Sequence, residues 1–581
     1  MGPERRKRRA DWLRVPVGPE APRWATRGRC KRILLVVHNV TSATRLLDVL
    51  PLFHDDLRVQ LLATCTGSSP FRSGVAELLA NVGVPVVPWE QALSLPVDLA
   101  ISASFGGQLH TLKGELTILS HGVGYNKKLA TPNAERRTPN AERRTPVFGL
   151  SPDWLLHRGI AVADTLVLSH PEQLERLRAS CPEVLPTALL AGDPCYDRLL
   201  AARQYRTRFR RALGVHRAQR LVVLNSTWNP ESLFGDGGEG DVLPALLGPA
   251  AYELPVDEYR VAAVLHPNIW HGHGPGQVRA WLDRAVRAGL LLVDPMEGWR
   301  QALVAADAVV GDFGSVSYYA AALGTPVLLA ADAPGRLDPT SPVAAFTREA
   351  PRWSPGVPLV DQLDRLITVH RPLPGPARLV SSQPGRSAEL LRRHFYKRLG
   401  LPEPPGPALL EPLPLPPYEA AVGTAPLRVA TRVCGPGEVA VERYADPPSE
   451  PRGRDPLHTA VPEDTRDPGR LDVADVILRH GTADDPRFGS PGSWTAEVLA
   501  RHPGCSVAAY VTGRGCCTAR TRAGREFLLA GHPEGPDPAV YASALHALLA
   551  SGGAPGRHLT VRTGRSAHRV SVSSRPAARE R

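Results

Sequence analysis

The chain has 581 residues, 43% of them hydrophobic, so it is too long for one core and too apolar to be disordered as a whole. The net charge is +12, and nearly all the basic residues are arginines. Because GC-rich codon usage also raises the arginine content, the charge alone does not indicate nucleic-acid binding, and we do not expect such binding. No run of 18 apolar residues predicts a membrane-spanning helix, and the eight cysteines show no CxxC or Cys/His ligand spacing.

Residues 1–29 form a basic N-terminal arm, with Arg-Arg-Lys-Arg-Arg at positions 5–9. No apolar segment follows this run, as a secretory signal would require. We therefore predict a cytoplasmic protein with a solvated arm, and peripheral contact with the anionic inner face of the membrane is the alternative.

From residue 30 to 215, short apolar runs alternate with helical patterns. The expected strands are RILLVV (32–37), VQLLAT (59–64), VPVV (84–87), DLAISAS (98–104) and LTILS (116–120). This alternation is typical of a parallel sheet covered by helices on both faces. We predict an α/β, Rossmann-like N-terminal domain over 30–215. The heptapeptide TPNAERR occurs twice in tandem within 131–144 and indicates a tolerant surface loop.

A second series of strands begins at RLVVLNS (220–226) and continues with YRVAAVLHP, GLLLVDP, ADAVVGD and TPVLLAA. It predicts a second doubly wound domain over 216–400 that ends in an amphipathic helix at 386–400. Residues 401–419 are Pro-rich and predict an exposed linker. We further predict an α+β accessory domain over 420–571, with a helix at 539–550, and a disordered tail over 572–581.

The segment 306–331 carries the strongest sign of a binding site. A predicted strand ends before Gly311, the turn contains Asp312 and Gly314, and a helix is expected to begin near Ser315. A strand, a Gly/Ser turn and a helix together direct free backbone N–H groups, here those at Ser315 and Val316, toward an anion. The alternative is a helix whose Asp312 and Ser315 cap only their own backbone.

Two histidines end predicted strands, one in each α/β domain. His121 follows LTILS and precedes Gly122 and Gly124, and His266 follows YRVAAVL and precedes Pro267. A histidine at a strand end is commonly structural, but two such residues facing one cleft would suit proton transfer near neutral pH. Histidines without carboxylate partners give little support to a metal site, so we expect no metal and no cofactor.

Taken in order, five segments resemble the CDP-glycerol glycerophosphotransferase family, the teichoic acid polymerases of GT-B fold. They are SHGVG (120–124), GDPCYDRL (192–199), NSTWN (225–229, with Thr227 and Trp228), HP (266–267) and DFGS (312–315). The chain departs from the family pattern at Val123-Gly124, and at Cys195, Asn229 and Tyr319, which replace two arginines and an acidic residue. UDP-N-acetylglucosamine 2-epimerases share this fold and a similar Gly/Ser turn.

The resemblance implies two Rossmann-like domains facing a cleft, with the N-terminal one on the acceptor side and the second on the nucleotide-donor side. It also implies transfer of a glycerophosphate-type group from CDP-glycerol to a polyol-phosphate or glycan hydroxyl. His121 would be the general base and His266 would stabilise charge. The nucleotide would contact Gly122, Gly124, Thr227, Trp228, Asp312, Gly314, Ser315 and Val316. Two alternatives are a nucleotide-sugar glycosyltransferase or epimerase, and a GT-B protein that binds a nucleotide or a partner without catalysis.

Overall fold

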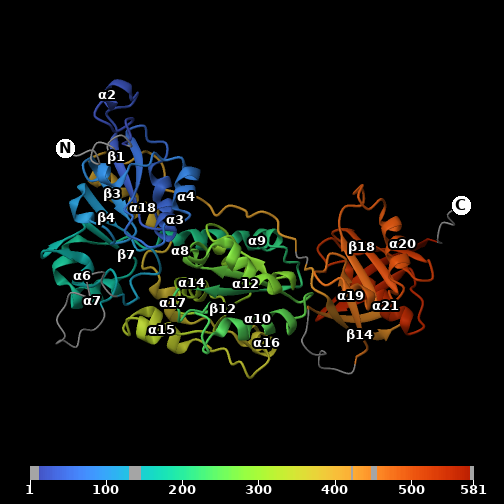
Figure 1. Ribbon diagram of the computed structural model, residues 1–581. Coiled ribbons are helices and arrows are strands. Elements are labelled where there is room, and N and C mark those ends of the chain that lie inside the picture. Colours follow the sequence, from blue (N-terminus) through green and yellow to red (C-terminus); the bar gives the residue numbers. More distant parts are fainter. Residues whose placement is uncertain (1–11, 130–145, 421–422, 446–454, 576–581) are drawn as a thin grey trace.

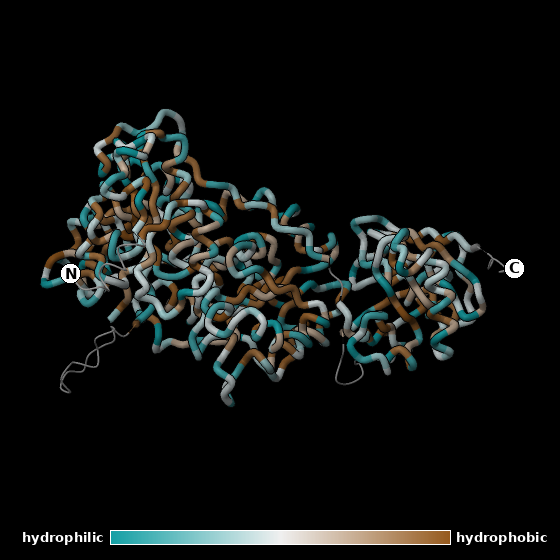
Figure 2. The backbone as a smooth tube through the Cα atoms, turned by 45° about the horizontal axis from the view of Figure 1, so that its top comes forward, coloured by the Kyte–Doolittle hydropathy of each residue, from teal (hydrophilic) through white to brown (hydrophobic). Residues whose placement is uncertain are grey.

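The computed structural model describes residues 12–129, 146–420, 423–445 and 455–575. Three bodies follow one another along the chain, from two α/β domains to a β-barrel (Figure 1). The hydrophobic stretches of the backbone run through the interiors of these bodies (Figure 2). The TPNAERR repeat, the basic run at 5–9 and the last six residues lie outside the described residues.

The first domain contains a six-stranded parallel sheet in the order β2-β1-β3-β4-β7-β8. The strands are β1 (Lys31–Val37), β2 (Val59–Cys65), β3 (Pro96–Ser102), β4 (Lys113–Ile118), β7 (Thr165–Leu168) and β8 (Ala188–Leu190), and the covering helices include α3 (Val40–Val49), α4 (Val75–Val82), α5 (Trp89–Ala92), α6 (Pro152–Leu155) and α7 (Pro171–Ser180). The expected strand at 84–87 contributes a single bridge, between Val86 and Ala63, because Pro85 has no N–H to donate.

The second domain contains a five-stranded parallel sheet in the order β11-β10-β9-β12-β13. The strands are β9 (Arg220–Ser226), β10 (Tyr259–Leu265), β11 (Leu291–Leu292), β12 (Ala308–Gly311) and β13 (Val327–Leu329). The helices are α10 (Val242–Tyr252), α11 (Pro267–His273), α12 (Pro275–Arg287), α13 (Trp299–Ala305), α14 (Ser315–Ala322), α15 (Pro342–Glu349), α16 (Leu359–Val369) and α17 (Pro374–Leu379). The chain therefore has the α/β class with two Rossmann-like domains that its sequence predicts.

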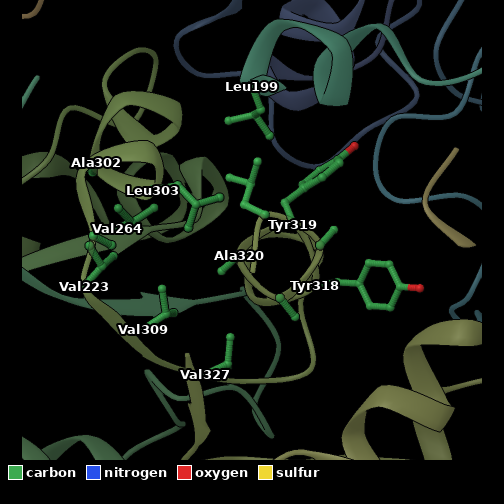
Figure 3. Packing of buried hydrophobic residues seen from close by; sticks show 14 of the residues in the cluster. Leu199, Val223, Val264, Ala302, Leu303, Val309, Tyr318, Tyr319, Ala320 and Val327 are labelled. Atoms are coloured by element: carbon green, nitrogen blue, oxygen red, sulfur yellow. The ribbon is translucent and has the colours of Figure 1, made fainter. Parts of the chain in front are cut away.

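Three helices cross between the domains. The sequence placed α8 (Pro194–Ala202) and α9 (Arg206–Ala212) in the first domain, but their apolar faces pack in the core of the second. Figure 3 shows Leu199 of α8 beside Tyr319 of α14. Conversely, Leu391 and Phe395 of α18 (Ser387–Leu399) are buried in the core of the first domain. The periodicity of a helix shows which of its faces is apolar, but it does not show which sheet will bury that face. The sequence therefore assigned these three helices to the wrong cores.

The third body is a closed nine-stranded barrel in the order β14-β15-β21-β22-β20-β19-β18-β17-β16. The strands are β14 (Leu427–Gly435), β15 (Glu438–Ala445), β16 (Leu457–Pro462), β17 (Val476–His480), β18 (Val507–Gly513), β19 (Cys516–Thr521), β20 (Glu526–Ala530), β21 (His558–Thr563) and β22 (Ser566–Arg575). Helix α21 (Ala539–Ala550) packs against strands around the barrel, and its residues 539–545 are fully buried. The helix therefore lies inside the barrel, while α20 (Pro491–Arg501) packs on β18 and β19.

The Pro-rich segment 401–418 lies along both α/β domains. The Pro402 carbonyl accepts a hydrogen bond from Arg58 at 3.0 Å, and the Glu411 carbonyl accepts one from Arg198 at 2.8 Å. Leu413 is buried in the core of the second domain, 8% exposed. We call residues 401–418 the strap, because their contacts tie them to the surface at several points. No helix among the described residues is long and apolar enough to cross a membrane.

The contacts of the strap predict a stability effect. Leu413→Ala should lower the free energy of unfolding by about 2 kcal/mol, because it leaves a cavity in the second core. Leu415, two residues on and 62% exposed, is the matched control, and its change to alanine should cost less than about 0.5 kcal/mol. Urea denaturation of the two variants measures both values. Equal, small effects would mean that the segment is a free linker.

Candidate functional site

The carboxyl ends of the strands in both sheets border one cavity of about 190 Å³ between the α/β domains. Ligands of doubly wound folds bind at this edge. Nine of the ten site residues proposed from the sequence line the cavity: His121, Gly122, Gly124, Thr227, Trp228, His266, Gly314, Ser315 and Val316. The structure therefore brings together residues that are as far as 195 positions apart in the chain.

Asp312 is the tenth predicted site residue, and it lies behind the cavity with no exposed surface. Its carboxylate accepts hydrogen bonds from the backbone N–H groups of Thr227 at 2.7 Å, Leu233 at 3.1 Å and Gly314 at 2.9 Å. These bonds occupy the carboxylate and hold the turn before α14, which is the backbone-capping alternative that the sequence left open for Asp312.

Helix α14 begins at Ser315, directly at the cavity, with Gly314 as its N-cap. No side chain of the described residues caps this end, so the first N–H groups of the helix face the cavity with their positive dipole. The Ser315 hydroxyl accepts a hydrogen bond from the N–H of Val123 at 3.2 Å, across the cleft. A Cβ at Gly122 would lie 2.7 Å from Ser315 Oγ, so the two domains approach closely only because this position is glycine.

His266 caps α11 and faces the cavity. Its Nδ1 accepts the N–H of Asn268 at 3.1 Å, so the neutral ring carries its proton on Nε2, which lies 3.4 Å from Thr41 Oγ1 of the first domain. Burial and the charge of Lys127 lower the pKa of His266 to about 3. The ring is therefore a neutral hydrogen-bond donor toward the cavity at physiological pH.

His121 lies on the opposite wall, and its ring packs edge-on against Phe148 with centroids 5.4 Å apart. Burial and the charges of Arg45 and Lys127 lower the pKa of His121 to about 4, although the Ala103 carbonyl opposes the shift as a hydrogen-bond acceptor. A ring that donates one N–H to a carbonyl keeps its second nitrogen as a proton acceptor. His121 is therefore neutral at physiological pH and keeps one ring nitrogen that can accept a hydrogen bond.

Two cations at the cavity were missed by the sequence interpretation. Lys127 Nζ contacts Thr227 Oγ1 at 3.1 Å and lies 5.3 Å from the centre of the Phe313 ring. Arg45 donates from Nε to the backbone carbonyl of His121 at 3.2 Å. The sequence did contain a sign of Lys127, because the chain has only six lysines and two adjacent ones follow the His121 turn. Arg45 sits in an ordinary helical pattern that gave no signal.

Trp228 is the aromatic residue at the rim of the cavity, 41% exposed, and Phe71 of the first domain meets it edge-on with centroids 5.3 Å apart. An exposed ring beside an anion site offers a stacking surface for a base. In contrast, the GDPCYDRL segment supports the fold. Asp193 caps α8 and accepts the Tyr319 hydroxyl at 2.6 Å, and Asp197 accepts the Gly385 N–H at 2.6 Å.

Comparison with known proteins found no matching family model and no matching curated sequence. Solved structures similar to this chain include the wall teichoic acid polymerase TagF with CDPG, at 12% identity over 65% of this chain and 91% of that one, with a TM-score of 0.43. They also include the UDP-GlcNAc 2-epimerases of Neisseria meningitidis (12% identity, 63% and 99% covered, TM-score 0.38) and Methanocaldococcus jannaschii (9%, 63% and 99%, 0.40).

The lowered pKa of His266 predicts acid destabilisation. The folded pKa is about 3 against 6.5 for the free side chain, so the unfolded chain takes up a proton below pH 6.5 that the folded chain does not. The contribution of His266 to the free energy of unfolding is fully present above pH 6.5. Below that pH it falls by about 1.4 kcal/mol per pH unit, down to about pH 4. His266→Asn keeps a capping oxygen and should remove this one-proton contribution between pH 6.5 and 5 in urea denaturation. Identical slopes for both proteins would contradict the shift.

Proposed function

We propose that the cleft transfers a glycerophosphate-type group from a CDP-activated donor to the hydroxyl of a polyol-phosphate or glycan acceptor. One observation carries the proposal: neutral His121, neutral His266, Lys127 and the uncapped start of α14 converge on one cavity. A base, a hydrogen-bond donor, a cation and a helix N-terminus are the groups that phosphoryl transfer requires.

In the proposed reaction, the acceptor hydroxyl attacks the donor β-phosphorus and gives its proton to His121. The new P–O bond forms as the bond to CMP breaks, and CMP leaves with the electron pair. His266 Nε2–H donates to an oxygen of the transferred phosphate, and Lys127 balances the charge that develops there. Positioning and electrostatics then account for most of the rate, as in other phosphoryl transfers.

The donor phosphates would bind the N–H groups of Ser315 and Val316, and the base would stack on Trp228. In the structure Ser315 Oγ already bonds to Val123 of the facing domain. The backbone N–H groups of Ser315 and Val316 take no part in this bond and stay available to the diphosphate. Lys127 and the N-terminus of α14 supply the positive charge in this proposal.

A second candidate is an enzyme that acts on a nucleotide sugar. Trp228 favours it as much as the first, because an exposed indole stacks on uracil as readily as on cytosine. The identity of the bound nucleotide separates the two candidates.

A thermal-shift panel of CDP-glycerol, CDP, CMP, UDP-N-acetylglucosamine and UDP tests the nucleotide. We expect cytidine compounds to stabilise the protein most, by about 2.7 kcal/mol at 100 times the dissociation constant. Ser315→Asp should abolish the shift by placing a negative charge at the phosphate, whereas Ser315→Ala, which keeps the backbone donors, should retain it. Larger shifts with uridine compounds would favour the second candidate. No shift with any nucleotide at millimolar concentration would leave a non-catalytic protein.

His121→Ala and His266→Ala should each lower turnover of CDP-glycerol by about 10²–10⁴-fold with the fold intact, since each removes a proton-transfer or charge-stabilising group. CMP release measures turnover, and circular dichroism checks the fold. His54→Ala, at an exposed position away from the cavity, is the control and should remain active. A folded double variant with unchanged turnover would assign both cleft histidines a structural role.

A further inference from the structure

A second cavity, of about 840 Å³, lies between the second α/β domain and the barrel. Its wall includes Tyr259 and Arg260 at the start of β10, whereas His266, directly after the end of β10, lines the cleft. A strand rises about 3.3 Å per residue, so the two cavities lie about 20 Å apart, at opposite edges of one sheet. We call this second space the barrel-side cavity.

Positive charge dominates the barrel-side cavity. Eight arginines line it, against three carboxylates, those of Asp257, Asp537 and Glu534. Arg443 is 2% exposed and bonds to Asp257 at 2.6 Å and Asp537 at 3.0 Å, and Asp537 also pairs with His480 at 2.9 Å. Nη1 of Arg443 is buried without an acceptor among the described residues. The carboxylates present are therefore already shared.

The neighbouring arginines share their carboxylates too. Arg206 and Arg210 both pair with one residue, Asp307, each at 2.6 Å. Arg287 pairs with Asp283 at 3.1 Å, and a further arginine pairs with the same carboxylate. Each of these groups contains two guanidinium charges and one carboxylate, so each keeps a net positive charge.

Three more arginines of the wall have no carboxylate partner among the described residues: Arg217, Arg260 and Arg514. Arg260 is 6% exposed, and its guanidinium donates to the carbonyls of Gly289 at 2.8 Å and Ala420 at 3.4 Å. Burial lowers the pKa of Arg260 to about 10. The charge of Glu419 attracts this guanidinium but does not offset the cost of burying it, and a bound anion would stabilise it further.

Part of the remaining wall is apolar and aromatic, beside the polar side chains of His216, Gln219 and His480. Leu247, Leu254 and Val256 line it, and the Arg514 guanidinium lies 4.8 Å from the centre of the Tyr418 ring. The volume is within the range of sites for drug-sized ligands, roughly 300–1,000 Å³. The cavity thus combines unpaired cations with a surface for an uncharged ring or chain.

We propose that the barrel-side cavity binds a small phosphate ester of nucleotide size. Its phosphate lies among Arg217, Arg260 and Arg514, because guanidinium groups bind phosphate oxygens through paired N–H donors. Its apolar or planar part lies on Leu247 and Leu254. Because the wall comes from both bodies, the bound ester also holds the barrel against the second domain.

Isothermal titration calorimetry on the full chain tests this site. The probes are ADP, glucose 6-phosphate and pyrophosphate, with citrate as an anion without phosphorus. We expect ADP or glucose 6-phosphate to bind better than citrate, and the better of the two identifies a nucleotide or a sugar phosphate. The double change Arg217→Ser and Arg514→Ser, at two exposed positions, should weaken that binding at least about tenfold.

Two controls separate this site from the cleft and from general charge. Arg432→Ser with Arg565→Ser removes the same charge from exposed barrel positions outside the cavity and should leave binding unchanged. Ser315→Asp should also leave it unchanged, since Ser315 lines only the cleft. The inference fails if no probe binds at millimolar concentration, if both double variants bind alike, or if Ser315→Asp abolishes binding. Turnover of CDP-glycerol is a separate readout of the proposed function.

Discussion

The buried carboxylate of Asp48 is the interaction on which the cleft depends. It lies on α3 of the first domain and accepts hydrogen bonds from Arg300 of the second at 2.8 and 3.0 Å, while Arg198 and Arg45 complete its shell. Burial opposes ionisation, but the three guanidinium groups hold the pKa of Asp48 below its usual range. Removing one partner from such a buried cluster costs several kcal/mol, so the relative position of the domains is strongly specified.

The same cluster also contacts the cavity, through Arg45. Arg45 bonds both to Asp48 and to the His121 carbonyl, and its guanidinium lies 5.6 Å from the ring centre of Trp299 and 5.8 Å from that of Tyr319. His121 is therefore held from behind by the group that joins the domains. The cleft is pre-organised by contacts between the domains as well as by the turns that carry its residues.

The sequence predicted well which residues follow the strand ends. It predicted poorly which side chains far apart in the chain contact one another. His121, His266 and the Ser315 turn could be found because the carboxyl ends of parallel strands meet at one edge of a sheet. The role of Asp312 could not, since a carboxylate in a Gly/Ser turn serves a ligand or its own backbone equally well. Arg45 was missed because its partner, Asp48, looks like an ordinary charge on a helix. The closed barrel and its central helix depend on strand pairings far apart in the chain, which alternation alone does not specify.

The strap also limits how the cleft can work. The carbonyls of residues 402 and 406 are bonded to the first domain, on which Ala408 and Leu410 also pack, and residues 411–414 contact the second domain, so the strap bridges the two domains. Proline fixes φ and makes this bridge stiff, with little slack to extend. Any movement of the two domains that widens the cleft must keep the contacts of the strap with both of them. Such a movement ends when the chain between these contacts is fully extended. Relative movement of the two α/β domains is thus limited by a length of backbone that contributes no side chain to the cavity.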